Sequence, residues 1–138
     1  MVDQVTNSQV IDVFSRSLRA ANLRHQVISN NIANVNTPNF KKSEVVFETL
    51  LAKQLSPDTK KLAMVRTNDK HLPKALSGGA YPSAQVEQIN TTSMRSDNNN
   101  VDIDSEMAGL AENNIYYNAV VRQTGDYFSS MKSVIKGQ

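Results

Sequence analysis

Few side chains in this sequence are of the types that do chemistry. It has two histidines, His25 and His71, and no cysteine, and neither histidine lies in an H-E-x-x-H run or another metal-ligand spacing. Because His25 recurs with apolar residues at helical spacing, we interpret it as a polar packing residue that sets helix register, with a pH switch as the alternative. The absence of cysteine excludes disulfides and thiol chemistry.

Other segments resemble known sites only superficially. The acidic run from Asp97 to Asp104 has the oxygen-rich composition of a calcium loop, but Val101 stands where a ligand is needed and no glycine provides the sharp turn. The pair Gly78-Gly79 lacks the lysine and the hydroxyl residue of a phosphate loop, and no serine lies in a nucleophile elbow. We therefore expect no catalytic residue, no metal and no cofactor, so an enzyme is not predicted.

Composition argues against nucleic acid and membrane partners. The formal charge of the 138 residues is only +2, and Lys41-Lys42 and Lys60-Lys61 are isolated pairs. No stretch of about 18 apolar residues could span a bilayer. The polar start, Met1 to Asn7, lacks the basic and apolar regions of a cleavable signal peptide. We expect no membrane insertion, and any export should use a route without signal cleavage.

The elements that could carry a function lie at the two ends of the chain. Near the N-terminus, apolar residues recur at alternating steps of three and four and define one narrow helical stripe. Its members are Ile11, Phe14, Leu18, Ala21, His25, Ile28, Ile32 and Val35. Thr6 and Gln9 match a capping box, so the helix should begin near Asn7 and end near Val35.

The C-terminal stretch repeats this pattern over a longer span. Its stripe consists of Ile103, Met107, Leu110, Asn114, Tyr117, Val121, Thr124, Phe128, Met131 and Ile135. Asp102 and Asp104 at its start and Lys136 at its end complement the helix dipole. Gly109 and Gly125 each cost about 1 kcal/mol relative to alanine, so this helix should need packing partners.

Two such helices cannot bury all of their apolar surface against each other. Further apolar residues flank the stripes, namely Ala20, Val27, Ile115, Tyr116, Val120, Tyr127 and Val134. We predict a mainly α fold in which the long terminal helices pair as an antiparallel coiled coil and the apolar members of both stripes form an assembly interface with other subunits. The alternative is an ordinary bundle with a third helix in the middle.

The middle of the chain is irregular. Candidate strands are Val45 to Phe47, Leu62 to Val65, and the surroundings of Val86 and Ile89. Phe47 to Leu55 could form a short helix, and Asn98-Asn99-Asn100 is interpreted as a flexible hinge or a turn.

A distinctive turn follows the first helix. Pro38 pushes Thr37 out of the helical region, and asparagines compete with the backbone for hydrogen bonds. The motif consists of Asn34, Asn36, Thr37, Pro38, Asn39 and Phe40. It resembles the signature of the flagellar rod, hook and hook-associated family, an Asn-rich helix end followed by Asn-Thr-Pro-Gly and an aromatic residue. Asn39 replaces the usual glycine, and we predict that it adopts a positive φ angle.

A second likeness lies before the C-terminal helix. The chain has an element from Asn98 to Met107 that is followed by the helical residues Asn113 to Tyr117. A short proximal-rod member of the family has a similar Val-Asp-hydrophobic-Asp element followed by a tyrosine-containing helix. This likeness favours that member over its short relative FlgC. The resemblance implies an inner axial domain made of residues 1–36 and 101–138, and a variable middle segment at 37–100.

The resemblance also implies a function. The chain would be a structural subunit of the proximal rod in the basal body, which transmits torque from the membrane ring to the distal rod and hook. Its partners would be other copies of itself, FlgC and other rod proteins, FliE at the ring junction, and the type III export apparatus. Phe47 and Leu51 match a short export-gate element, although a packing role for Phe47 is equally consistent. Alternatives are FlgC itself, or a non-flagellar coiled-coil adaptor or export chaperone.

Overall fold

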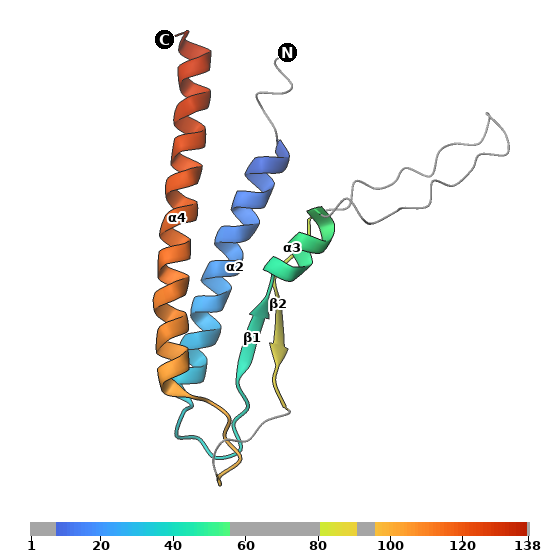
Figure 1. Cartoon of the computed structure of the whole chain (residues 1–138), viewed down its shortest axis with the longest axis vertical. Helices are drawn as coiled ribbons and strands as arrows, with labels where there is room; N and C mark the ends of the chain where they lie inside the picture. Colours follow the sequence, from blue (N-terminus) through green and yellow to red (C-terminus); the bar gives the residue numbers. More distant parts are fainter. Residues whose placement is uncertain (1–7, 56–80, 91–95, 138) are drawn as a thin grey trace, which may run out of the picture.

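Two long helices dominate the fold. The computed structural model describes residues 8–55, 81–90 and 96–137. They form α2 (Ser8–Ala33), β1 (Ser43–Val46), α3 (Glu48–Leu55), β2 (Gln85–Gln88) and α4 (Ile103–Lys136). Figure 1 shows α2 and α4 side by side in opposite directions, with β1, β2 and α3 on the other side of α2. The predicted mainly α fold, with antiparallel terminal helices and a middle of short strands and a short helix, is confirmed.

Small and polar side chains make the contact between α2 and α4. Ala21 is almost fully buried, and its carbonyl oxygen accepts a hydrogen bond of 2.9 Å from Nδ2 of Asn113. Nearer the start of α2, the rings of Phe14 and Tyr127 meet edge to face with centroids 6.1 Å apart. Small side chains at a helix contact let the axes approach closely. A chain with only 6% aromatic residues can therefore still pair two long helices.

The face of α4 that packs on α2 lies one residue away from the predicted stripe. Glu106 and Asn113 are buried, and Val120 and Tyr127 continue that line as partly buried residues at steps of seven. Most of the large residues of the predicted stripe are exposed by 43% to 78%: Ile103, Met107, Tyr117, Val121, Phe128 and Ile135. Leu110 and Met131 lie between the two faces and are partly buried. The α4 stripe predicted as an assembly interface thus lies beside the line that packs on α2, and apolar periodicity could not detect that line because it is built on Glu106 and Asn113.

Both ends of α4 have recognisable caps. The side chain of Asp102 accepts a hydrogen bond of 3.1 Å from the backbone N–H of Asp104. At the other end, Gly137 has φ 70° and its N–H donates to the Ser133 carbonyl oxygen at 3.0 Å. This left-handed glycine closes the last turn of α4. The capping box predicted from Thr6 and Gln9 lies partly outside the described residues.

The two short strands are held against α2. β1 and β2 pair antiparallel with Val45 opposite Val86, and Val45 is buried. An isolated pair of strands is marginally stable in water, so packing of β1 on α2 is needed to keep the pair in place. Arg16 of α2 also donates through Nη1 to the carbonyl oxygen of Tyr81, four residues before β2. These findings confirm the strands predicted around Val45 and Val86, whereas the strand predicted at Leu62 to Val65 lies outside the described residues.

Candidate functional site: the amide junction and the exposed helix face

The turn after α2 has the geometry that its motif predicts. The N–H of Thr37 donates to the Asn34 carbonyl oxygen at 3.0 Å, and the N–H of Phe40 donates to the Thr37 carbonyl oxygen at 3.3 Å. Asn39 has φ 63°, which confirms the predicted left-handed conformation. Its N–H donates to the carbonyl oxygen of Asp97 at 2.9 Å. The turn thus contacts the segment that leads into α4.

Asn99 joins the two segments. Its side chain is fully buried, and Nδ2 lies 3.0, 3.0 and 2.9 Å from the carbonyl oxygens of Asn34, Val35 and Thr37. Its Oδ1 accepts a hydrogen bond of 2.8 Å from the N–H of Val101. One side chain thereby donates to three carbonyl groups of the turn that follows α2 and holds that turn against the segment before α4. Of the two interpretations of Asn98-Asn99-Asn100, a flexible hinge or a turn, these hydrogen bonds fit the turn.

The side-chain amides of Asn31 and Asn100 connect the helix ends to the two strands. Oδ1 of Asn31 accepts from the N–H of Ser43 at 3.1 Å, and its Nδ2 donates to the Ser43 carbonyl oxygen at 2.9 Å and to Oε2 of Glu106 at 3.0 Å. Asn100 bridges the strands in the same way, accepting from the N–H of Lys42 and donating to the carbonyl oxygen of Ile89, both at 2.7 Å. Side-chain amides here replace the backbone partners that a longer sheet would supply.

We name this group of buried side chains the amide junction; it consists of Asn31, Asn99, Asn100 and Glu106. It ties the end of α2, the start of β1 and the start of α4 together. Sequence reasoning missed it as a site, because buried asparagines have no periodic signature of their own. One signal could have revealed them: asparagines are concentrated around the end of α2 and just before the start of α4.

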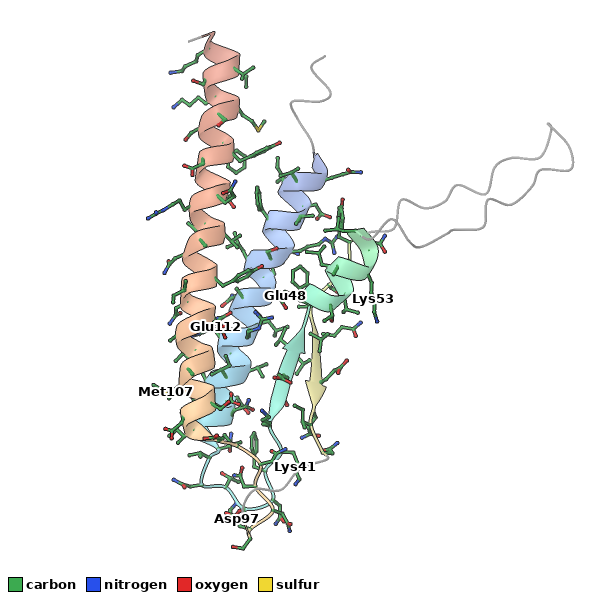
Figure 2. The ribbon with its side chains drawn as sticks, viewed as in Figure 1. Lys41, Glu48, Lys53, Asp97, Met107 and Glu112 are labelled. Atoms are coloured by element: carbon green, nitrogen blue, oxygen red, sulfur yellow. The ribbon has the colours of Figure 1, made fainter. Side chains whose placement is uncertain are left out.

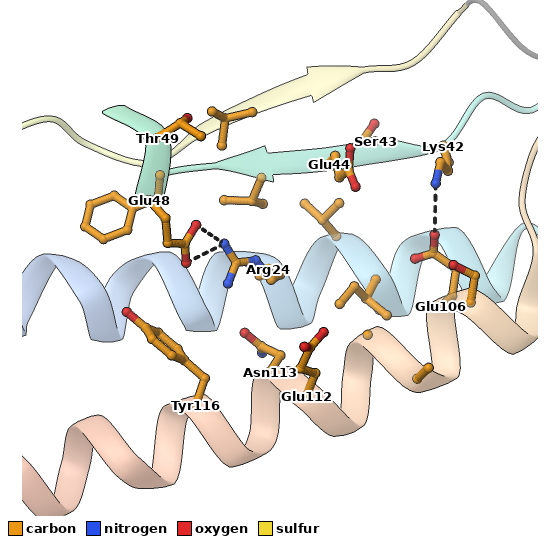
Figure 3. A pocket seen from close by; sticks show the side chains of 18 residues that line it. Arg24, Lys42, Ser43, Glu44, Glu48, Thr49, Glu106, Glu112, Asn113 and Tyr116 are labelled. Carbon is orange, nitrogen blue, oxygen red and sulfur yellow. Dashed lines mark hydrogen bonds and ion pairs between the residues drawn. The ribbon is translucent and has the colours of Figure 1, made fainter. Parts of the chain in front are cut away.

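A groove runs beside the amide junction, between α4 and the segment from β1 to α3 (Figure 3). Nη2 of Arg24 donates to both carboxylate oxygens of Glu48, at 2.8 and 2.6 Å. Partial burial would raise the pKa of the Glu48 carboxyl, but the hydrogen bond from Arg24, a hydrogen bond from its own backbone and the charge of Arg24 together lower it. Nζ of Lys42 lies 4.0 Å from Oε1 of Glu106.

The predicted assembly residues divide into two groups. Those of α2 are buried or partly buried in the chain itself: Ile11, Phe14, Leu18, Ala21, Ile28 and Ile32, with Val35 in the turn that follows. His25, by contrast, is exposed in the isolated chain, and its interpretation as a polar packing residue stays a prediction. The large exposed residues of the predicted α4 stripe form what we call the open stripe: Ile103, Met107, Tyr117, Val121, Phe128 and Ile135. Figure 2 shows Met107 on the side of α4 that faces away from α2.

The predicted export element also has a place in the fold. Phe47 is fully buried, directly before α3, and its carbonyl oxygen accepts from the N–H of Leu51 at 2.9 Å. This burial is what a packing role for Phe47 requires, and the export element stays a prediction. Among the described residues there is no group of three or more side chains that could hold a metal ion. None of the described helices is long and apolar enough to cross a membrane.

Comparisons with known proteins support the family resemblance that the turn motif indicated. A family model described as "Flagella basal body rod protein" matches residues 11–41, which cover most of α2 and the turn. The flagellar basal body rod protein FlgB of Borreliella burgdorferi is 36% identical over 129 residues, covering 91% of this chain and 95% of that protein. FlgB of Bacillus subtilis is 35% identical over 130 residues, covering 94% and 95%. The chain therefore belongs to the FlgB family of flagellar basal body rod proteins, which are structural components of the rod and not enzymes.

Proposed function

We propose that this chain is a proximal-rod subunit that transmits torque from the membrane ring to the distal rod and hook. Membership of the FlgB family supports a place in the rod. The observation that carries the mechanical part is the open stripe, a row of large apolar side chains along one face of α4 that the chain itself leaves exposed. Apolar surface of this kind gains free energy when a neighbouring subunit covers it.

The amide junction supports the same role. A subunit that passes torque must keep its helices at a constant angle to its other segments. Buried and hydrogen-bonded amides do this well, because displacing them leaves polar groups without partners, at a cost of roughly 1–3 kcal/mol each. We propose that residues 1–36 and 101–138 form the inner axial part of the subunit, and that residues 37–100 form an outer part that Asn31 and Asn100 hold in place.

The neighbours and the export route belong to this proposal. Other copies of the chain, FlgC and FliE are the proposed rod partners. The chain would leave the cytoplasm through the flagellar type III apparatus without cleavage of a signal peptide. Because Phe47 is fully buried in the folded chain, an export gate could read Phe47 and Leu51 only before folding. This order fits a substrate that passes through a narrow channel unfolded.

Electron cryo-microscopy of purified basal bodies tests the proposal. We expect density for α2 and α4 at the base of the rod, with the open stripe covered by a neighbouring subunit. A deletion strain should lack rod beyond the ring and should not swim. Finding the open stripe exposed to solvent in the assembled rod would contradict the proposed interface. Finding the chain outside the basal body would contradict the function.

A further inference from the structure

The groove beside the amide junction has properties that packing within the chain does not explain. It has a volume of about 730 Å³ and is open along one side. Ile28, Val45 and Phe47 give it apolar walls, and Glu44, Glu48 and Glu112 line it as well. Figure 3 shows Glu112, Asn113 and Tyr116 extending from α4 toward α2, with β1 on the other side of α2. The open stripe is formed by other residues of α4, so the groove is a separate surface.

The groove carries unpaired negative charge. Glu48 is neutralised by Arg24, and Glu106 has Lys42 nearby. Glu44 and Glu112, in contrast, are exposed and form no ion pair with any described residue. An occupant with a lysine or arginine opposite them would find electrostatic complementarity that the chain alone does not provide.

Asn113 leaves an acceptor unused at the bottom of the groove. The residue is 4% exposed, and its Nδ2 is occupied by the Ala21 carbonyl oxygen. Its Oδ1 is buried and has no hydrogen-bond partner among the described residues. An unpaired buried acceptor costs roughly 1–3 kcal/mol, which a donor entering the groove would recover.

Gly109 gives the groove room for a closely packed backbone. A Cβ atom added there would meet only Cδ1 of Ile28, at 3.8 Å, which is an ordinary contact. Packing within the chain therefore does not require glycine, although glycine in a helix costs about 1 kcal/mol relative to alanine. Ser105 and Ala108 line the groove beside it, so α4 offers a shallow row of small side chains, as close helix pairs use.

We propose that the groove receives a basic amphipathic helix from a neighbouring axial subunit, packed against Ser105, Ala108 and Gly109 with a lysine or arginine opposite Glu112. The end of α4 is itself a basic amphipathic helix of this kind, because Lys132 lies at helical spacing between the exposed apolar residues Phe128 and Ile135. The proposal rests on the proposed rod function and adds to it a second docking surface and the kind of segment that fills it.

Photo-crosslinking in assembled basal bodies tests this docking. In the test variant, a photoreactive phenylalanine derivative replaces Ala108, which is exposed and lines the groove. In the control variant, the same derivative replaces Asn118, which is exposed on α4 outside the groove. We expect the position 108 adduct to map to a helix of another axial subunit with apolar residues and a lysine or arginine within one turn. Failure to incorporate the 108 variant while the 118 variant is incorporated would also support an occupied groove.

Different failures have different meanings. Adducts from position 108 only to strands, loops or acidic segments, or no adduct although the chain is present in the basal body, would overturn the groove proposal and leave the rod function standing. Absence of the wild-type chain from basal bodies would overturn both.

A pair of alanine variants provides an independent measurement. Gly109→Ala should melt at an equal or higher temperature in the isolated chain and yet reduce swimming at least severalfold, because the methyl group occupies space needed by the partner. Asn118→Ala should leave swimming unchanged. Glu112→Arg, at an exposed position, should also reduce swimming without lowering the melting temperature. Normal swimming of both the Gly109→Ala and Glu112→Arg strains would refute the docking.

Discussion

Asn99 donates from its buried side-chain amide to the carbonyl oxygen of Thr37, 2.9 Å away and 62 residues earlier in the chain. This hydrogen bond, with those to Asn34 and Val35, connects the family turn directly to the segment that starts α4. The N-terminal motif and the Asn-rich element before the second helix are therefore two halves of one structure. Their joint presence in the sequence has a physical reason, because each satisfies the polar groups of the other.

Removing this side chain should destabilise the isolated chain. Asn99→Ala removes the buried Nδ2 donor to three carbonyl groups of the turn and the Oδ1 acceptor of the Val101 N–H, so we expect a loss of roughly 1–3 kcal/mol in the free energy of unfolding. Asn99→Asp should lose more, because a carboxylate oxygen would face three carbonyl oxygens. Urea denaturation followed by circular dichroism measures both. Asn98→Gly is the matched control, since Asn98 is exposed with φ 63° and glycine accepts that angle. Equal stability of Asn99→Ala and wild type would show that the amide is dispensable.

Backbone geometry at Asn39 gives a second prediction. Asn39→Gly should be neutral or slightly stabilising, whereas Asn39→Val should cost on the order of 1–2 kcal/mol, because a β-branched residue is strained at φ 63°. Rod assembly and swimming should follow the same order. If glycine and valine behave alike in both the melting temperature and swimming, the turn does not depend on a left-handed residue at this position.

Charges placed on the two helices should have different effects. Ile28 is 8% exposed within the chain, so Ile28→Asp should unfold the isolated protein by burying an unpaired carboxylate, at a cost of roughly 3–5 kcal/mol. Val121 is 44% exposed on the open stripe, so Val121→Asp should leave the isolated fold intact and abolish rod assembly. Circular dichroism and motility assays separate the two. Normal swimming of a Val121→Asp strain would mean that the open stripe faces solvent in the rod.

The Arg24–Glu48 pair predicts a small pH dependence. The pKa of the Glu48 carboxyl is lower in the folded chain than its ordinary value of 4.5. A lowered pKa means that the charged carboxylate stabilises the fold above about pH 4.5, and that this contribution is lost as the pH falls through the folded value. Because the Glu48 side chain is 49% exposed, the contribution should be only about 0.2–1 kcal/mol. Subtracting the pH profile of Glu48→Gln from that of wild type should reveal it, with Glu44→Gln as the control. A difference that grows toward acid pH would contradict the assignment.

The sequence contained enough information for the helices, the turn and the short strands. Their signals are local: apolar spacing, Pro38 after an Asn-rich helix end, and β-branched residues at Val45 and Val46. The face of α4 that meets α2 was not predictable in this way. That contact uses Asn113 and Glu106, whose burial depends on partners 92 and 75 residues away in the chain. Apolar periodicity predicts that such polar residues face solvent, so it indicates only the apolar line of α4, which was predicted as an assembly interface and stays a prediction.

For Asn99 and Asn100 the sequence left two interpretations open, a flexible hinge or a turn. A run of asparagines usually indicates a mobile loop, because amides compete with regular backbone hydrogen bonding. Here the competing hydrogen bonds are made to another segment, so the run is buried and fixed. Only the tertiary arrangement distinguishes these two outcomes.

In mechanical terms the two long helices resemble the prongs of a fork whose stem is the amide junction. The end of α2 and the start of α4 are clamped there, whereas the start of α2 and the end of α4 lie at the far end (Figure 1). Toward that far end, Phe14 and Tyr127 make an aromatic contact between the prongs. A sideways load on the tips would therefore be resisted mainly at the stem, where bending must break hydrogen bonds to Asn31 and Asn99. Hydrogen bonds of a few side chains hold the base of this fork together, so changes there would alter how the chain bends and leave the residues of the open stripe unchanged.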